Sequence, residues 1–328
     1  MKRIALLALA TALALPAAAA RPTDDALALV PPDSVTAGML RVSDLRTSPL
    51  AARFFSEFDR ATVDGDAAKF LAEARLHPID DVDLVVFAAQ AEPKGKALVA
   101  FEGRFDPQRL AAAAAARGAE ARTASGTAYF LLKDKDHPEH QGDGAVAFVS
   151  SRLLVAGSEE AVVKALAARA AGGTGFRGGA GLGAELGKVD ASATGWLLVD
   201  RTKLPEAKGS LTISSGEGDP ARNVLGAMNL VSTFAFQMTV KGDSIRLSGA
   251  GYSDDADTRE LLEDALRGVL AAARIASEDK PEVVSAIRKF KVSSDRNAVT
   301  IAGTLDGATI RMLAEKKARA AEKKAATQ

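Results

Sequence analysis

The alternation of apolar and polar positions predicts a chain built from β-hairpins and helices. In the clearest segment, Phe234, Phe236, Met238 and Val240 alternate with polar or small residues. Because successive side chains of a strand point to opposite faces, this pattern predicts a strand with one apolar face. The chain then turns at residues 242–243 and alternates again. This segment therefore predicts a β-hairpin.

Helices are predicted by apolar positions that recur every three or four residues and by the capping residues before them. Asp106 is followed by Pro107, an N-cap and a first-turn proline that together favour the start of a helix. Ser158 precedes two glutamates, which favour a helix N-terminus because they oppose its dipole. Asp306 is predicted to cap the last helix, which begins near Ala308.

Hairpins that lead directly into helices predict the α+β class, with antiparallel sheets and helices packed on one sheet face. A similar order, in which a strand runs through a glycine into a capped helix, occurs at residues 153–163 and 299–310. We therefore expect two halves of related topology, and reuse of a common strand and helix unit is the alternative. The predicted organisation is a signal peptide (1–20), an N-terminal α+β half (21–171), a Gly-rich linker (172–190), a C-terminal α+β half (191–314) and a charged helical tail (315–328).

The first 20 residues have the three-part pattern of a secretory signal peptide. Lys2 and Arg3 are followed by an apolar run over Ile4–Leu15 and by small residues that end at Ala20. The apolar run is shorter than the roughly 18–20 residues that span a bilayer, which disfavours an uncleaved anchor. We expect cleavage after Ala20, a periplasmic or secreted location, and no transmembrane segment in the mature chain.

The composition excludes several classes of function. The chain has 42 Lys and Arg against 42 Asp and Glu, and only 5% of its residues are aromatic. It therefore lacks the positive field and the stacking surface that nucleic-acid binding requires. It has no cysteine, which excludes disulfides, thiol nucleophiles and thiolate metal sites. Loss of the signal peptide removes Lys2 and Arg3, so the mature chain is slightly acidic.

The polar loop at residues 134–143 holds the densest set of potential metal ligands. His137, His140 and Asp136 carry the nitrogen and oxygen donors that zinc and similar ions prefer. Pro138 lies between the two histidines, so they do not form a helical pair. A loop of this composition is usually solvated, and metal binding is the alternative hypothesis.

Other motifs do not meet the requirements of the chemistry that they suggest. Residues 173–178 match a dinucleotide-binding glycine pattern, but a helix rather than a strand is predicted to precede them. Ser277 and Lys280 form an S-x-x-K pair, but the chain contains no K-T-G. The acidic clusters lack the ligand spacing of a calcium-binding EF-hand loop. We therefore predict no catalytic residues and no cofactor.

Short motifs spread over the mature chain resemble a group of bacterial proteins. They are Val-Pro-Pro-Asp at 30–33, the segment 79–83 before an apolar strand, and the segment 149–158 before a helix. In these motifs the chain is similar to exported proteins of unknown function described as DUF3352-like. The resemblance implies an exported α+β protein with duplicated halves, and it brings no catalytic residues.

The C-terminal tail is rich in lysine and alanine and has no large apolar face. Its composition favours a solvated terminal helix, and contact with an anionic lipid surface is the alternative.

Together these patterns predict an exported, soluble, non-enzymatic binding or structural protein of the cell envelope. Its partner would be an envelope protein or a ligand that the sequence does not identify. One alternative is a metal-dependent hydrolase that uses the His137 and His140 loop. The other is a chaperone-like assembly factor, which a large exposed apolar groove between the two halves would favour.

Overall fold

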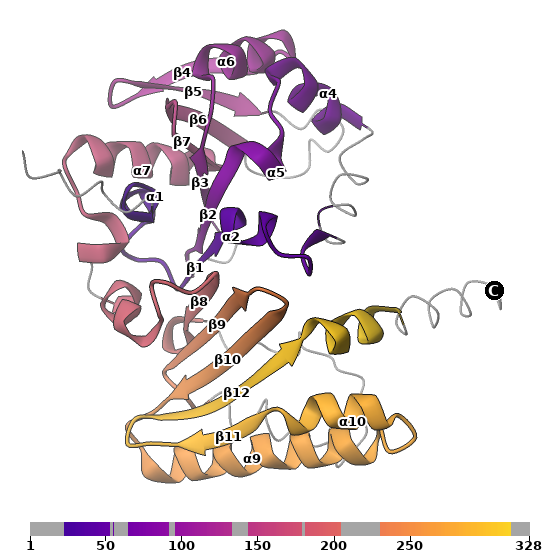
Figure 1. The fold of residues 1–328 in the computed structure, drawn as a ribbon. Coiled ribbons are helices and arrows are strands. Elements are labelled where there is room, and N and C mark those ends of the chain that lie inside the picture. Colours follow the sequence, from indigo (N-terminus) through magenta and orange to yellow (C-terminus); the bar gives the residue numbers. More distant parts are fainter. Residues whose placement is uncertain are drawn as a thin grey trace, which may run out of the picture.

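A computed structural model describes residues 23–52, 55, 65–91, 96–132, 144–178, 181–204 and 230–315 of the chain. The described strands form one 12-stranded antiparallel sheet (Figure 1). From one edge to the other, the strands are β11 (Lys291–Ser294), β12 (Ala298–Asp306), β10 (Ser244–Tyr252), β9 (Thr233–Lys241), β8 (Gly195–Asp200), β1 (Thr36–Arg41), β2 (Val82–Ala89), β3 (Ala97–Gly103), β7 (Leu153–Ser158), β6 (Gly144–Ser150), β5 (Thr127–Leu132) and β4 (Glu120–Ala124).

Helices are interspersed with these strands, which confirms the predicted α+β class. The α-helices are α1 (Thr23–Leu29), α2 (Val42–Arg46), α4 (Gly65–Ala74), α5 (Pro78–Asp81), α6 (Pro107–Ala116), α7 (Glu159–Ala170), α9 (Ala256–Ile275) and α10 (Pro281–Arg288). Short 3-10 helices are η1 (Gly175–Gly178), η2 (Gly181–Lys188) and η3 (Arg201–Lys203). Residues 307–315 are helical and directly follow β12. Within the described part of the chain, no helix combines the length and the apolar character needed to cross a membrane.

The sheet continues through the middle of the chain because β1 pairs with β8. Gly38 of β1 lies opposite Leu197 of β8, and Met39 lies opposite Trp196. On one side the order is β1, β2, β3 and then β7, and on the other it is β8, β9, β10 and then β12. The N-terminal and C-terminal parts of the chain therefore extend from a shared centre (Figure 1).

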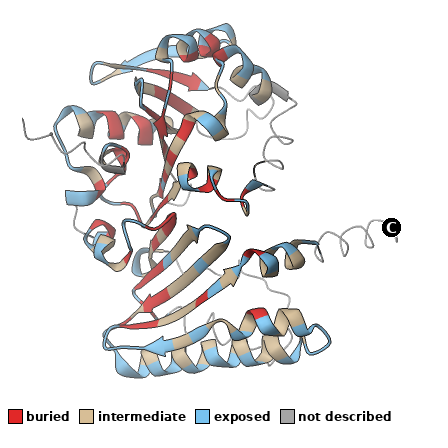
Figure 2. Cartoon of the chain, in the orientation of Figure 1, coloured by how far each residue is buried: buried red, intermediate tan, exposed pale blue. Residues whose placement is uncertain are grey.

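In the N-terminal part, apolar cores lie against both faces of the sheet, and many strand positions there are red in Figure 2. One core joins β2, β3 and β7 to α1 and α7, and its members include Val86 and Leu166. The other joins β5, β6 and β7 to α4 and α6, and includes Phe130 and Leu110. The expectation that helices cover only one sheet face is wrong here. The physical reason is that β7 has apolar residues in succession, so each face needs its own cover.

The C-terminal part has the expected single core. The predicted hairpin is confirmed, since β9 and β10 pair with Phe236 opposite Gly249. Phe234, Val299 and Leu262 of α9 are buried together on one face. The other face carries polar residues such as Gln237. Much of α9 is exposed (Figure 2), so this part of the fold has less burial to stabilise it.

The Gly-rich segment predicted as a linker contains packed structure. Phe176 of η1 is 0% exposed and Leu182 of η2 is 1% exposed, and both belong to the core shared with α1. Gly175 has a φ of +55°, and a Cβ atom there would lie 2.3 Å from the carbonyl oxygen of Ala28. Only glycine combines this backbone conformation with such a close approach. The glycines of this segment therefore bring η1 against α1.

The predicted helix caps are confirmed at α6, at α7 and at the helix after β12, where the capping residues are Asp106, Ser158 and Asp306. Asp255 caps α9. The Thr258 hydroxyl and backbone N–H both donate to the Asp255 carboxylate and lower its pKa. The ammonium group of Lys289 lowers the pKa of Asp306 far below the ordinary range, and the backbone N–H of Thr309 adds to the effect. Both carboxylates are therefore held in their charged form as caps.

Candidate functional site

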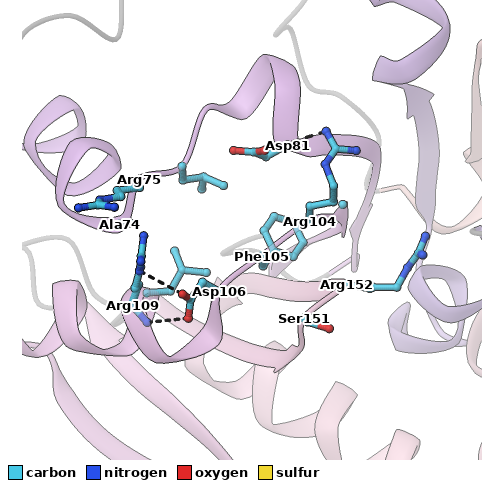
Figure 3. Close-up of a pocket in the computed structure, with 12 residues that line it drawn as sticks. Ala74, Arg75, Asp81, Arg104, Phe105, Asp106, Arg109, Ser151 and Arg152 are labelled. Atoms are coloured by element: carbon cyan, nitrogen blue, oxygen red, sulfur yellow. Dashed lines mark hydrogen bonds and ion pairs between the residues drawn. The ribbon is translucent and has the colours of Figure 1, made fainter.

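A pocket of about 470 Å³ lies in the N-terminal part, where the ends of α4 and β3 approach α6 (Figure 3). Its volume is in the range of sites that bind small molecules. The lining residues come from four separate segments of the chain: Ala74, Arg75 and Leu76; Asp81; Gly103, Arg104, Phe105, Asp106, Arg109 and Leu110; and Ser151 with Arg152.

The floor of the pocket is apolar, and it forms where β3 leads through Phe105 into α6. The backbone N–H of Phe105 donates to the carbonyl of Ser151 at 2.8 Å, which holds this connection against the turn between β6 and β7. Asp106 then caps α6 and orients its first turn so that Leu110 faces inward. Phe105 is 8% exposed, Leu110 is 1% exposed and Ala74 is 4% exposed. The floor therefore offers packing contacts and few polar atoms.

Two of the four arginines at the rim have acidic partners. Arg109 Nε lies 3.1 Å from Asp106 Oδ2. Arg104 Nη1 lies 3.5 Å from Asp83 Oδ1, and its Nη2 lies 4.0 Å from Asp81 Oδ1. Both arginine side chains are about half exposed or more. These pairs fix the two guanidinium groups near the pocket without burying them.

The other two arginines at the rim, Arg75 and Arg152, are exposed and have no ion pair with any described residue. The two acids of the pocket already have backbone partners. Asp106 Oδ1 accepts the N–H of Gln108 at 3.1 Å, and Asp81 Oδ2 accepts the N–H of His77 at 2.8 Å. The lining thus has four arginines against two aspartates, an excess of two positive charges.

Arg75 also has an unusual backbone. Its φ is +49°, in the left-handed region that glycine normally occupies after a helix. The N–H of Leu76 reaches back to the carbonyl of Leu71 at 2.9 Å, which closes the end of α4. A non-glycine residue here costs about 1–2 kcal/mol relative to a relaxed backbone. The chain therefore places a long cationic side chain at the rim in spite of a local conformational penalty.

The chemistry available in the pocket is that of anion binding. Guanidinium groups form paired hydrogen bonds with carboxylates and phosphates, and the apolar floor suits an uncharged body attached to such a group. Ser151 supplies the hydroxyl among the lining residues, and none of them is a histidine. Nucleophilic catalysis requires a nucleophile with a base within hydrogen-bonding reach. The lining residues do not provide that pair.

The metal site predicted at His137, His140 and Asp136 lies outside the described residues, which omit 133–143. That site stays a prediction. Where the structure does describe the chain, it places no three His, Asp or Glu side chains together as potential metal ligands. The signal peptide at 1–20 and the tail beyond residue 315 also lie outside the described residues.

A partly exposed apolar row crosses the centre of the sheet, where the two parts of the chain meet. We use the name apolar row for Phe87, Gly38, Leu197 and Phe236, which lie opposite one another on β2, β1, β8 and β9. Phe87 is 37% exposed and Phe236 is 43% exposed. The Phe87 ring lies over Gly38, so close that a Cβ atom there would be 2.2 Å from the ring Cζ.

Sequence reasoning missed the pocket because its arginines are distant from one another along the chain and follow no motif. Arg75 and Arg152 each stand alone at the end of an element. A local signal existed only for Asp106, through its capping position before Pro107. The pairing of β3 with β7 brings Arg104 and Arg152 to the same end of these two strands, and such tertiary contacts create the site.

Comparison with family models finds no match for this chain, and comparison with the curated proteins finds none either. The chain is similar in fold to solved structures of TP0453. Crystal form III of TP0453 aligns with a TM-score of 0.50 and 10% identity over 86% of this chain and 94% of that chain. Crystal forms I and IV align with TM-scores of 0.46 and 0.47, also at 10% identity, over 87% and 88% of this chain and 94% and 95% of those chains. The likeness to crystal form III concerns the fold alone.

Proposed function

We propose that this chain is an exported, non-enzymatic binding protein of the cell envelope, and that it holds a small anionic ligand in the arginine-rimmed pocket. The observation that carries the proposal is the excess of two positive charges around an apolar floor. The charge is available to a ligand because Arg75 and Arg152 are exposed and have no ion pair with a described residue. Export is supported by the signal-like pattern of the first 20 residues.

The binding role is favoured over catalysis by the residue types in the pocket. A hydrolase would need an activated nucleophile or a bound water with a general base near the ligand. Here Ser151 has no histidine beside it among the lining residues. The carboxylates of Asp81 and Asp106 accept hydrogen bonds from nearby backbone N–H groups, and this structural role explains their positions.

A fluorescence titration with 8-anilino-1-naphthalenesulfonate tests the proposal, because this probe combines an anionic group with an apolar aromatic body. We expect saturable binding by the purified mature protein. Replacing both Arg75→Gln and Arg152→Gln should weaken binding at least about tenfold, since both unpaired charges at the rim are lost. Arg296→Gln is the matched control: this exposed arginine lies in the turn between β11 and β12, and its loss should leave the titration unchanged.

The opposite result identifies the other candidate surface. If the double arginine variant bound the probe as the wild type does, while Phe87→Ser with Phe236→Ser abolished binding, the pocket proposal would be overturned. The ligand surface would then be the apolar row. That row is the specific observation in favour of a chaperone-like assembly factor, because an exposed apolar surface between the two parts of the chain suits an apolar polypeptide segment.

We also infer that the two parts of the chain are related halves. In the first part, β1, β2 and β3 are neighbours and β7 pairs with β3. In the second part, β8, β9 and β10 are neighbours and β12 pairs with β10. Gly38 and Leu197 lie opposite each other on the two central strands. Phe87 lies opposite Gly38 and Phe236 lies opposite Leu197, so the two phenylalanines occupy equivalent positions in the register. Gly157 lies opposite Leu98 and Gly303 lies opposite Leu247, so the two glycines of the recurring sequence pattern have similar neighbours. These relations support an internal duplication, with β4 and β5 as additions to the first half.

A further inference from the structure

The four arginines of the pocket fall into two pairs that come from different sides of it. Arg104 and Arg152 belong to the ends of the paired strands β3 and β7, where the N–H of Gly103 donates to the carbonyl of Arg152 at 3.0 Å. Arg75 and Arg109 belong to the end of α4 and the first turn of α6. Figure 3 shows the two pairs on opposite sides of Phe105.

Each pair contains one arginine that is already neutralised and one that is not. On the helix side, Arg109 is 3.1 Å from Asp106, whereas Arg75 has no ion pair with a described residue. On the strand side, Arg104 is 3.5 Å from Asp83, whereas Arg152 has no ion pair with a described residue. The excess positive charge is therefore divided, with one unit at each end of the pocket.

The middle of the pocket disfavours charge. Phe105 and Leu110 form the floor between the two ends and are 8% and 1% exposed. A charged group placed over them would lose hydration without gaining a hydrogen-bonding partner. An apolar group at the same place would gain contact area at about 25 cal/mol per Å² of apolar surface removed from water.

We propose that the ligand carries two anionic groups at opposite ends of an apolar body, with one group bound by Arg75 and the other by Arg152. This inference rests on the proposed function and adds the chemical class of the ligand. Carboxylate and phosphate groups both suit a guanidinium partner. In Figure 3 the two side chains extend outward from Phe105. As exposed side chains, they change rotamer rapidly and can turn toward a ligand over the floor.

Isothermal titration of the mature protein with aliphatic α,ω-dicarboxylates tests this class of ligand. The probes are glutarate, suberate and sebacate, compared with octanoate and decanoate as singly charged counterparts of similar length. We expect the best-fitting dicarboxylate to bind at least about tenfold more tightly than the monocarboxylate of the same length. The matching α,ω-bisphosphonates form a second series, and whichever series binds more tightly identifies the anionic group.

Single variants test whether the two ends act separately. Arg75→Gln and Arg152→Gln should each reduce the affinity for the dicarboxylate to that of the monocarboxylate, while Arg296→Gln should change neither. Equal affinity of the wild type for singly and doubly charged probes would overturn the two-ended ligand and leave the binding function intact. Absence of binding by every probe in both series, combined with an unaltered response of the sulfonate probe in the double arginine variant, would overturn the proposed function itself.

Discussion

Replacing Phe176 by alanine should lower the free energy of unfolding by about 3–5 kcal/mol, the cost of removing a fully buried aromatic ring from a close-packed core. Phe176 is 0% exposed and belongs to the core that also contains residues of α1 and α7. A linker residue exposed to solvent would change stability by only a few tenths of a kcal/mol. Urea unfolding followed by circular dichroism measures the difference.

Two further variants make this result interpretable. Phe236→Ala removes the same ring from a position that is 43% exposed, so its cost should be clearly smaller. Phe176→Leu keeps most of the buried volume and should fold even if the alanine variant does not, with a loss of about 1.5 kcal/mol or less. An alanine variant at position 176 as stable as the wild type would show that the Gly-rich segment does not contribute to the core.

Replacing Gly157 by alanine should destabilise the fold by about 1–3 kcal/mol, because a new methyl group would collide with the neighbouring strand. A Cβ atom at this position would lie 2.3 Å from the carbonyl oxygen of Ala97 and 3.1 Å from the Cα of Leu98. Both atoms belong to the backbone of β3, which cannot move aside as a flexible side chain does. The strand pair at the centre of the N-terminal part would have to separate locally.

Gly144→Ala is the matched control, since this glycine lies in the adjacent strand β6. A Cβ atom there would be 3.7 Å from the nearest atom, the Cβ of Leu132, which is an ordinary contact. The change in unfolding free energy should stay within about 0.5 kcal/mol. Similar midpoints for both variants in thermal unfolding would contradict the close approach of β7 to β3.

The features that the sequence predicts well depend on local chemistry. The hairpin of β9 and β10 follows from strict alternation on one apolar face. The caps at Asp106, Ser158 and Asp306 follow from side chains that accept hydrogen bonds from the nearby first turn. Such interactions involve residues close in sequence, so their pattern is visible before the fold is known.

Other features depend on contacts between distant segments. β4 has no apolar alternation, because it is an edge strand whose residues are exposed or only partly buried; its pairing with β5 alone defines it. Glu102 is 5% exposed and accepts the N–H of Ala26 at 2.9 Å, a contact between β3 and α1 that no local pattern indicates. The candidate site has the same origin, because Arg75 and Arg152 meet one pocket only after the sheet has formed.

A crystal structure of the mature protein with suberate tests the central claim most directly. We predict one suberate molecule in the pocket, with its two carboxylates bound by the guanidinium groups of Arg75 and Arg152 and its methylene chain over Phe105. Suberate bound along Phe87 and Phe236 instead, with the arginine-rimmed pocket occupied by water alone, would contradict the claim.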